Sequence, residues 1–387
     1  MIANGKNLFR FIGQHCILNR LAKAHLNKTT SLLPLQSNSL TIGPPAREFS
    51  DDRSGLKILP DYLYNIDDVI NEYNMGHTSD WYSKALEYNL KKGKHYRQML
   101  TVLSYEYLMK HQGLEIENTK LAHILGWCVE LFQAAIVICD DIMDGSTSRR
   151  GQLCWYKLPE VGITALNDAI IFENSIYVLL RQYFRNAECY LDLMELFNEI
   201  TLITACGQNM DMLGSRMPVK SFTMEMYRNV AITKTAYYSF YLPFALAMHL
   251  AGIKNPETFK MAKCILLEMG YLYQVQNDVL DCFGNPKITG KIGTDIEENK
   301  CSWLAVECLR QANEEQQRTL VDCYGKKDPK MVKCVKDLYQ TLQLPKLYAD
   351  YEDKTCNQIL TMTKEASEHL PKELILQILK KIFKRKE

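Results

Sequence analysis

The sequence predicts an all-α protein, built as a single large helical bundle around a central cavity. Apolar residues recur every three or four positions over stretches that are too long for strands, which is the pattern of amphipathic helices. Short segments rich in Gly, Pro and Asn separate these stretches. No convincing run of alternating polar and apolar residues suggests a sheet. Together, these features favour helices that pack on helices.

The expected helices follow one another from about residue 57 to the end of the chain. The clearest of them cover residues 121–141, 163–184, 190–213, 236–253 and 257–281. Turn signals separate them at residues 144–152, 214–221, 252–257 and 283–293. The 236–253 helix carries no charge and is apolar on almost every side, so we place it in the inner layer. Its length would allow a membrane span, but its tyrosines, Pro243 and His249 favour a core helix, and we expect no transmembrane segment.

The charge balance gives no general attraction to nucleic acid. The chain of 387 residues has 46 Lys and Arg against 45 Asp and Glu, which leaves a net charge of +1. Its 13 cysteines include no Cys-x-x-Cys pair and no His/Cys cluster at metal-ligand spacing. This distribution argues against a structural zinc site or a disulfide framework, and we expect reduced thiols in a core.

Residues 1–50 are predicted to form a basic leader in front of an all-α domain at residues 51–387. Up to Arg47 the leader contains basic residues and no acid, and apolar residues such as Leu8 and Phe9 are interleaved among them. A basic, acid-free and amphipathic segment is typical of a mitochondrial transit peptide. The alternative is a disordered tail on a cytoplasmic protein.

Two acidic clusters each stand at the end of a long apolar stretch. The first is CDDIMD, with Asp140 and Asp144, and the second is QNDVLD, with Asn277, Asp278 and Asp281. Side chains four residues apart lie on one face of a helix, so the oxygens of each cluster can face one ligand. For a single pair a solvated helix end would be the better interpretation, but two clusters after apolar stretches indicate a cavity rim. Such oxygens suit Mg²⁺, which also takes water and substrate phosphates as ligands.

Basic residues near both clusters supply the charge that a phosphate needs. They are Lys94 and Arg97 beside Gly93, Arg149 and Arg150 after the first cluster, Lys234 between the clusters, and Lys291 and Lys300 after the second. A nucleotide phosphotransferase with a G-x-x-x-x-G-K-[ST] loop is excluded, because the sequence has neither that loop nor a strand to carry it. The expected ligand is an anionic polyphosphate with an apolar remainder that fits a helix-lined cavity.

Five longer motifs resemble those of one known family. They are DDIMDGSTSRRGQLCWY, GQNMD, KTAYYSFYLP, YQVQNDVLDCFG and GKIGTDIEENKCSWL, in this order. From about residue 58 to its C-terminus, the chain is similar to the short-chain isoprenyl diphosphate synthases, and most closely to the farnesyl diphosphate synthases of animals, insects in particular. The resemblance implies the isoprenoid synthase fold, a homodimer and about three Mg²⁺ ions in each active site.

The resemblance also implies a Mg²⁺-dependent head-to-tail condensation. Isopentenyl diphosphate would join dimethylallyl or geranyl diphosphate, which gives farnesyl or geranyl diphosphate and releases pyrophosphate. By position in the motifs, the implied metal ligands are Asp140, Asp144, Asn277, Asp278 and Asp281. The residues implied to hold the allylic diphosphate are Arg149, Lys234, Lys291 and Lys300. Those implied to hold isopentenyl diphosphate are Gly93, Lys94, Arg97, Gln133 and Arg150.

The implied catalytic chemistry needs no protein nucleophile. Arg149 and Lys234 would stabilise the charge that builds up on the departing diphosphate, as the metal ions would. Thr235, Gln274 and the carbonyl of Lys234 are implied to stabilise the allylic cation. The departing pyrophosphate would take the final proton.

Three departures from the family pattern bear on the expected activity. Asn277 stands where the family usually has Asp, so one metal ion should be held less tightly. Gln98 replaces a glycine of the isopentenyl diphosphate motif and could reshape that loop. Ala135 and Ile136 replace residues that are commonly aromatic in farnesyl enzymes, and they should form the floor on which the growing chain stops. Their size leaves room for a geranylgeranyl-length product, or for the branched substrates that lead to insect juvenile hormones.

Two alternatives stay open on the sequence alone. A class I terpene synthase ionises and cyclises the same substrates, and Asn-led metal motifs occur in such enzymes. It has no use for the five residues implied to hold isopentenyl diphosphate, which favours condensation. A catalytically inactive partner subunit would have lost several phosphate ligands at once, and this chain retains them.

Overall fold

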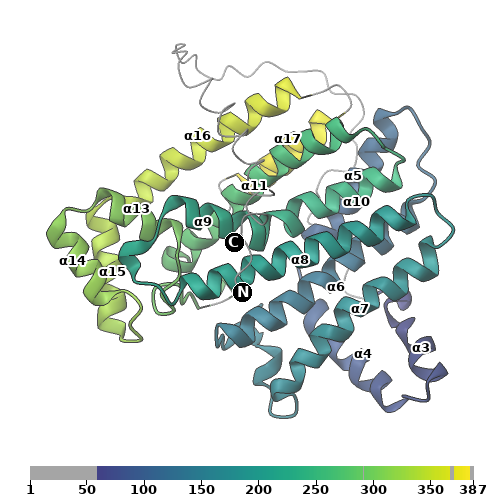
Figure 1. Cartoon of the computed structure of the whole chain (residues 1–387), viewed down its shortest axis with the longest axis horizontal. Helices are drawn as coiled ribbons and strands as arrows, with labels where there is room; N and C mark the ends of the chain where they lie inside the picture. The colour runs from purple at the N-terminus through teal and green to yellow at the C-terminus, as the bar shows by residue number, and fades with distance from the viewer. Residues whose placement is uncertain (1–58, 291, 367–369, 384–387) are drawn as a thin grey trace, which may run out of the picture. The chain divides into compact units, whose positions relative to one another are not determined.

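The computed structural model describes residues 59–290, 292–366 and 370–383, and the predicted all-α class is confirmed there (Figure 1). The leader predicted at residues 1–50 lies outside the described residues. One short antiparallel hairpin pairs Ser148–Arg149 (β1) with Gln152–Leu153 (β2), where the sequence had suggested no sheet. Arg150 and Gly151 close it with positive φ angles of 53° and 72°, so the tight turn gives β1 and β2 their pairing.

The first half of the described chain contains α3 (Ile66–Glu72), α4 (His77–Leu90), α5 (Tyr96–His111), α6 (Thr119–Met143), α7 (Ala165–Phe184) and α8 (Tyr190–Gly214). The second half contains α9 (Met224–Val230), η5 (Ala231–Tyr241), α10 (Leu242–Leu250), α11 (Pro256–Phe283), α12 (Pro286–Thr289), α13 (Trp303–Gln311), α14 (Glu314–Cys323), α15 (Pro329–Thr341), α16 (Leu344–Glu365) and α17 (Lys372–Ile382). Short 3₁₀ turns lie at Asp61–Tyr64 (η1), Trp155–Lys157 (η2), Gly162–Thr164 (η3) and Val219–Ser221 (η4).

The helix predicted at residues 236–253 differs from a single α-helix. Its first part belongs to η5, a π-helix in which the Leu242 N–H bonds to the Tyr237 carbonyl, five residues back. Pro243 has no N–H to donate, and the ladder changes to α-helical spacing at this point. The side chains from Leu242 to Met248 are buried, as expected for the inner layer.

Two glycines allow η5 to pack closely between α8 and α11. A Cβ on Gly207 of α8 would lie 2.4 Å from the backbone nitrogen of Lys234, and one on Gly270 of α11 would lie 2.4 Å from the Ala236 Cβ. A side chain at either position would push the neighbouring helix away from η5. This close approach holds Lys234 and Thr235 between the two long helices that carry the other site residues.

Side-chain caps fix where the helices of the second half begin. The Asn255 side chain accepts from the Glu257 N–H at the start of α11, and the Ser302 side chain accepts from the Ala305 N–H at the start of α13. Asn313 and Gln316 form a reciprocal capping box at the start of α14. These caps satisfy amide groups that the first helical turn leaves without partners. The Ser302 cap also fixes the end of the segment between α11 and α13, which carries part of the site.

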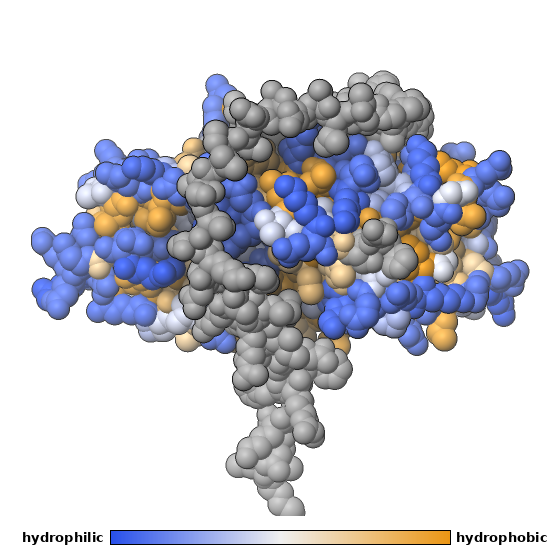
Figure 2. Space-filling view, turned by 90° about the horizontal axis from the view of Figure 1, so that it is seen from above, coloured by the Kyte–Doolittle hydropathy of each residue, from blue (hydrophilic) through white to orange (hydrophobic). Residues whose placement is uncertain are grey.

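Two described segments are long and apolar enough to cross a membrane, by length and composition alone. These are α6 and residues 162–184. In the apolar 18-residue window of α6, 72% of the residues are buried in the protein, which is the behaviour of a core helix. On the face drawn in Figure 2, hydrophilic residues predominate and hydrophobic ones form separate patches. Neither helix gives more than weak support for a membrane span.

Candidate active site

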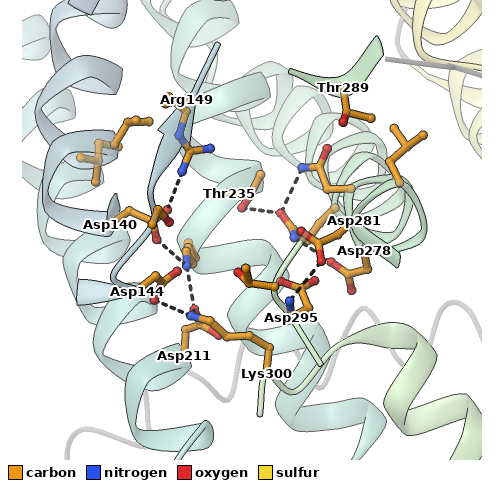
Figure 3. Close-up of a pocket in the computed structure, with 18 of the residues that line it drawn as sticks. Asp140, Asp144, Arg149, Asp211, Thr235, Asp278, Asp281, Thr289, Asp295 and Lys300 are labelled. Atoms are coloured by element: carbon orange, nitrogen blue, oxygen red, sulfur yellow. Dashed lines mark hydrogen bonds and ion pairs between the residues drawn. The ribbon is translucent and has the colours of Figure 1, made fainter. Parts of the chain in front are cut away.

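A cavity of about 850 Å³ opens between the helices, and both acidic clusters line it. The first cluster lies at the end of α6 and the second near the end of α11. Figure 3 shows the two clusters on opposite sides of the cavity, with Thr235 of η5 between them. We call the α6 side, with Asp140, Asp144 and Asp211, the first wall, and the α11 side, with Asn277, Asp278 and Asp281, the second wall.

The acids of the first wall are paired with cations from three other elements. Lys234 of η5 lies 2.9 Å from Asp140 and 2.7 Å from Asp211. Lys300, from the loop before α13, lies 2.8 Å from Asp144 and 2.7 Å from Asp211. Figure 3 marks these ion pairs, in which each lysine bridges two carboxylates. Lys234 and Lys300, which are expected to hold a diphosphate, therefore neutralise the negative charge of the first wall.

Arg149 of β1 completes this network. Its guanidinium donates to Asp141 at 3.0 and 2.5 Å, and to the Asp140 Oδ2 at 3.4 Å. Asp141 is buried, so this pair fixes the hairpin against the end of α6. Arg149 can lose its contact with Asp140 and still keep its anchor on Asp141.

The charges of the first wall shift the pKa values of its acids in opposite directions. Burial would raise the pKa of Asp140, but Lys234 and Arg149 outweigh burial and hold that pKa well below its usual range. Asp211 behaves in the same way, because Lys234 and Lys300 lower its pKa against the effect of burial. The pKa of Asp144 is raised by burial and by the negative charge of Asp140, despite Lys300. An additional cation beside Asp144 would therefore stabilise its ionised form.

The second wall uses its acids to hold the protein itself together. Asp278 is 4% exposed, and its two oxygens accept from the Trp303 N–H at 2.8 Å and the Gln274 amide at 2.9 Å. Burial raises the pKa of Asp278 to about 6. The Asp281 Oδ1 accepts from the Asp295 N–H at 3.1 Å. These bonds attach the loop between α11 and α13 to α11.

A short hydrogen-bond chain links the second wall to η5. The Thr235 hydroxyl donates to the Gln274 Oε1 at 2.8 Å, and the Gln274 amide nitrogen donates to Asp278. The Asn277 amide nitrogen also donates to the Gln274 Oε1, at 3.4 Å. Gln274 is therefore held in one orientation, with Thr235 on one side and Asp278 on the other.

A second group of cations lies in the part of the cavity formed by α5, α6 and η5. Arg97 donates to Gln133 at 2.7 Å and to Ser239 at 2.6 Å, and its guanidinium lies over the ring of Tyr238. Arg150 donates to the carbonyl of Asn89. Lys94 lines the cavity beside them. Among the described residues, the first-wall carboxylates form their ion pairs with Arg149, Lys234 and Lys300. Arg97 and Arg150 interact with the buried Glu130 instead, so they form a second cationic region of the cavity.

Gln98, which replaces a glycine of the family pattern, has a structural role. The Gln98 side chain is buried, and its amide nitrogen lies 2.8 Å from the His123 Nδ1. Its backbone N–H donates to the Glu130 Oε1 at 3.3 Å. Gln98 thus points into the α5–α6 contact rather than into the cavity.

The structure brings most of the predicted site residues to this one cavity. Those that line it are Lys94, Arg97, Gln133, Ile136, Asp140, Asp144, Arg149, Arg150, Lys234, Thr235, Gln274, Asn277, Asp278, Asp281 and Lys300. Gly93 and Ala135 are not among the lining residues. Lys291 lies outside the described residues. Of the two residues predicted to form the floor, Ile136 faces the cavity, whereas Ala135 is buried in the core.

Sequence reasoning left Asp211 without a role. It lies in the GQNMD motif at the end of α8, and it contacts both lysines of the first wall. The signal that identified the other acids was present here too, because Asp211 ends a long apolar helix. Tyr238 and Asp295 also line the cavity; they lie in the KTAYYSFYLP and GKIGTDIEENKCSWL motifs, but sequence reasoning assigned no role to either residue.

The donor set fits Mg²⁺ held jointly with a phosphate. Among the described residues, no three His, Cys, Asp or Glu side chains converge as a ready metal site. The first-wall carboxylates are hard oxygen ligands, and they are now held by lysines that phosphate oxygens could also hold. Mg²⁺ commonly keeps waters and binds through one or two carboxylates plus substrate phosphates, which matches an arrangement of this kind.

Acids and cations around an apolar helical cavity define an enzyme that binds a polyphosphate, and comparison with known proteins identifies its family. Residues 79–342 match the family model of polyprenyl synthetases. The match covers more than half of the chain, so the chain belongs to the polyprenyl synthetase family. It is a prenyltransferase.

Individual relatives agree with this assignment. The chain is 40% identical to a farnesyl pyrophosphate synthase of Murgantia histrionica, over 90% of this chain and 86% of the relative. It is 41% identical to a farnesyl pyrophosphate synthase of Gallus gallus, over 83% and 88%. A solved structure of the T. brucei farnesyl diphosphate synthase, complexed with risedronate, superposes with a TM-score of 0.78 at 27% identity, and covers 84% of this chain and 96% of that one.

Proposed function

We propose that this prenyltransferase condenses isopentenyl diphosphate head-to-tail with dimethylallyl or geranyl diphosphate, and forms farnesyl diphosphate and pyrophosphate. The observation that carries the proposal is the presence of two separate cation groups in one cavity. One group, Lys234 and Lys300, forms ion pairs with Asp140, Asp144 and Asp211. The other, Arg97 and Arg150, lies beside Glu130, apart from these three acids. An enzyme that joins two diphosphates needs both groups, whereas a cyclase needs only the first.

The first group would hold the allylic diphosphate. Bound to Asp140, Asp144 and the phosphate oxygens, Mg²⁺ would stabilise the negative charge that develops as pyrophosphate leaves. Lys234, Lys300 and Arg149 would exchange their carboxylate contacts for phosphate oxygens, and Asp141 would keep Arg149 in position. We propose about three ions, as in the family that the motifs resemble.

Residues between the two groups of basic side chains would stabilise the allylic carbocation that forms when pyrophosphate leaves. The Thr235 hydroxyl and the Gln274 amide are fixed by their mutual bond and by Asp278, so their dipoles need no reorganisation during the reaction. The double bond of isopentenyl diphosphate, held by Lys94, Arg97, Gln133 and Arg150, would attack the cation. The departing pyrophosphate would then accept the proton.

The deciding experiment compares the two cation groups in steady-state kinetics. Lys94→Ala and Arg150→Ala should raise the KM for isopentenyl diphosphate by about tenfold or more, with a small effect on the allylic KM, because each removes a charge-assisted contact to one diphosphate. Lys300→Ala is the matched control and should raise the allylic KM instead. Conversion of geranyl or farnesyl diphosphate to hydrocarbons without isopentenyl diphosphate would instead establish a terpene synthase.

We propose that product length depends chiefly on Ile136. The smaller residues at positions 135 and 136 leave space for geranylgeranyl-length products or branched substrates, including those that lead to juvenile hormones. Ile136 lines the cavity and Ala135 does not, so the two positions should differ in their effect on product length.

A homodimer is also proposed, through the faces of α7 and α8. Ile170 is 60% exposed, and Leu202 and Leu213 are 66% and 60% exposed. Apolar residues gathered on two packed helices are typical of a protein interface, and a second copy would cover them. Leu202→Lys with Leu213→Lys should give a monomer in sedimentation velocity, and an unchanged sedimentation coefficient would argue against this face.

Mitochondrial import through residues 1–50 is a further proposal, supported by the basic and acid-free composition up to Arg47. A reporter fused to residues 1–50 should enter mitochondria. As a control, the same fusion with its arginines and lysines changed to glutamine should remain in the cytoplasm. If the unchanged fusion also remained there, the segment would not be a transit peptide.

A further inference from the structure

Two thiols that the proposed reaction does not use lie together where α14 packs against α15. Cys323 is the last residue of α14, and Cys334 lies in α15, which packs against α14. The Cys323 thiol lies within hydrogen-bonding reach of the Cys334 thiol, and no disulfide joins them. Cys323 is 6% exposed, whereas Cys334 is only partly buried. One thiol of the pair is therefore more open to solvent than the other.

The turn that connects α14 to α15 supports the loop that carries Lys300. The Tyr324 hydroxyl donates to the Lys300 carbonyl at 2.8 Å, and the Gly325 N–H donates to the Ile296 carbonyl at 2.9 Å. Lys327 forms an ion pair with Glu298 at 2.9 Å. Each contact begins within four residues of Cys323 and ends within the segment 296–300. The position of the end of α14 therefore bears directly on Lys300.

We propose that Cys323 and Cys334 form a reversible redox modification site, at which a peroxide or a small-molecule disulfide joins the two sulfurs and weakens the support of Lys300. With hydrogen peroxide, the Cys334 sulfur attacks one peroxide oxygen, the O–O bond breaks and water leaves, which gives a sulfenic acid. The Cys323 sulfur then attacks the Cys334 sulfur, the S–S bond forms and the second water leaves. Two thiols lose two electrons and two protons, and the peroxide takes up both.

The surroundings of the two thiols set this order. Burial raises the pKa of Cys323 to about 11, so at neutral pH Cys323 is almost entirely protonated and a poor first nucleophile. Cys334 is more exposed and meets the oxidant first. Cys323 is then in contact with the oxidised sulfur and excludes other thiols from it.

The expected consequence follows from the length of the new bond. Two thiols in contact must approach to about 2.05 Å to form a disulfide, which draws the end of α14 toward α15. Tyr324 is the next residue, so this movement should disturb its hydrogen bond to the Lys300 carbonyl. The loss of that hydrogen bond should raise the KM for the allylic diphosphate by about fivefold. This kinetic part rests on the proposed function, whereas the formation of the disulfide does not.

The test uses the full chain, treated with hydrogen peroxide or with glutathione disulfide. Non-reducing digestion and mass spectrometry should find a peptide linked between Cys323 and Cys334, and dithiothreitol should remove the link and restore the allylic KM. Cys206→Ser is the matched control, because Cys206 is an exposed thiol on α8, and this variant should keep both responses. Absence of the linked peptide, while Cys206 is oxidised in the parent chain, would overturn the proposal.

Two variants separate the redox site from the proposed catalytic function. Cys334→Ser should abolish the linked peptide and the response of the allylic KM to peroxide. Tyr324→Phe should raise the allylic KM by about fivefold without oxidant and still form the linked peptide. A peroxide response that persists in Cys334→Ser would overturn the redox site. A linked peptide in a chain that does not use an allylic diphosphate would contradict the proposed function alone.

Discussion

The two walls of the cavity carry sequence motifs of the same spacing, but they bond differently. On the first wall, Asp140 and Asp144 are held by lysine side chains from distant elements. On the second wall, Asp278 accepts from the backbone amide of Trp303, the first residue of α13, and Asp281 accepts from that of Asp295 in the loop before α13. A lysine can turn to another anion at little cost, whereas a buried amide that loses its acceptor has no water to replace it. The first wall is therefore arranged to exchange partners, and the second to stay fixed.

This difference suggests two roles: the first wall binds the diphosphate and metal, and the second wall keeps the neighbouring side chains in position. The first wall can release its lysines to a diphosphate when a metal ion takes over its carboxylates. The second wall keeps Gln274 and Thr235 in place while that exchange occurs. If this division is correct, substitutions on the first wall should affect the reaction, and those on the second wall should affect stability first.

The largest effect is expected from Asp140→Ala. The variant loses a hard oxygen ligand and leaves Lys234 and Arg149 to bind phosphate without the metal that should lie between, so the barrier to ionisation should rise by several kcal/mol, about a thousandfold in rate. Single-turnover kinetics at saturating Mg²⁺ would measure it. Asp168→Asn is a matched control, because Asp168 is also buried but bonds Trp81 and Trp155 away from the cavity. It should lower the melting temperature and spare the Mg²⁺ dependence. Near-normal turnover of Asp140→Ala would remove the metal role of the first wall.

For Asp278→Ala we expect the opposite result, a large loss of stability with little change in Mg²⁺ dependence. The Trp303 N–H and the Gln274 amide would both lose their acceptor, which should lower the free energy of unfolding by about 1–3 kcal/mol. Chemical denaturation measures this loss, and a Mg²⁺ titration of the same variant should show little change in the half-saturating concentration. The reverse outcome, with stability kept and Mg²⁺ dependence strongly altered, would make Asp278 the metal ligand that the resemblance implies.

The contrast between the walls also shows what the sequence could and could not predict. Periodicity gave the helices that carry both clusters, and the helix expected at residues 257–281 is observed at Pro256–Phe283. Spacing alone placed the acids of each cluster on one face. It could not show that Asp278 accepts from the Trp303 N–H, because that bond joins residues 25 positions apart in the chain. Local patterns fix which face a residue lies on, and the partner comes from tertiary packing.

The same limit applies to the floor of the cavity. Ala135 and Ile136 are neighbours in the sequence, but the helix turns by about 100° per residue, so only one of them faces the cavity. The interruption by η5 was equally hidden, since a π-helix and an α-helix have the same apolar composition. The Cys323–Cys334 contact was hidden because nothing in cysteine spacing indicates which helices pack together.

A further prediction tests whether the first wall also controls product length. Ile136→Phe should fill the end of the cavity, and overfilling of a packed site costs about 1–3 kcal/mol, so products longer than farnesyl diphosphate should fall by about tenfold. Chromatography of the dephosphorylated products measures the ratio. Ala135→Phe is the matched control: it places the same ring in the core, and should lower the melting temperature with a smaller change in the product ratio. An equal shift in both variants would show that the floor does not depend on Ile136.

The smallest expected effect concerns the residue at which the two walls differ in the sequence itself. Asn277→Asp adds a third carboxylate to the second wall, beside those of Asp278 and Asp281. If position 277 contributes a metal ligand, the added charge should strengthen Mg²⁺ binding by on the order of 1 kcal/mol and lower the half-saturating Mg²⁺ concentration by about fivefold. Tryptophan fluorescence, titrated with Mg²⁺ in the presence of pyrophosphate, would report this without turnover, and Asn277→Ala should shift the curve the other way. Because Asn277 also donates to Gln274, both substitutions remove that bond, so any change common to the two variants reflects Gln274 and only their difference reflects the metal. Identical curves for the Asp and Ala variants would mean that position 277 does not touch the metal, and that the second wall is structural throughout.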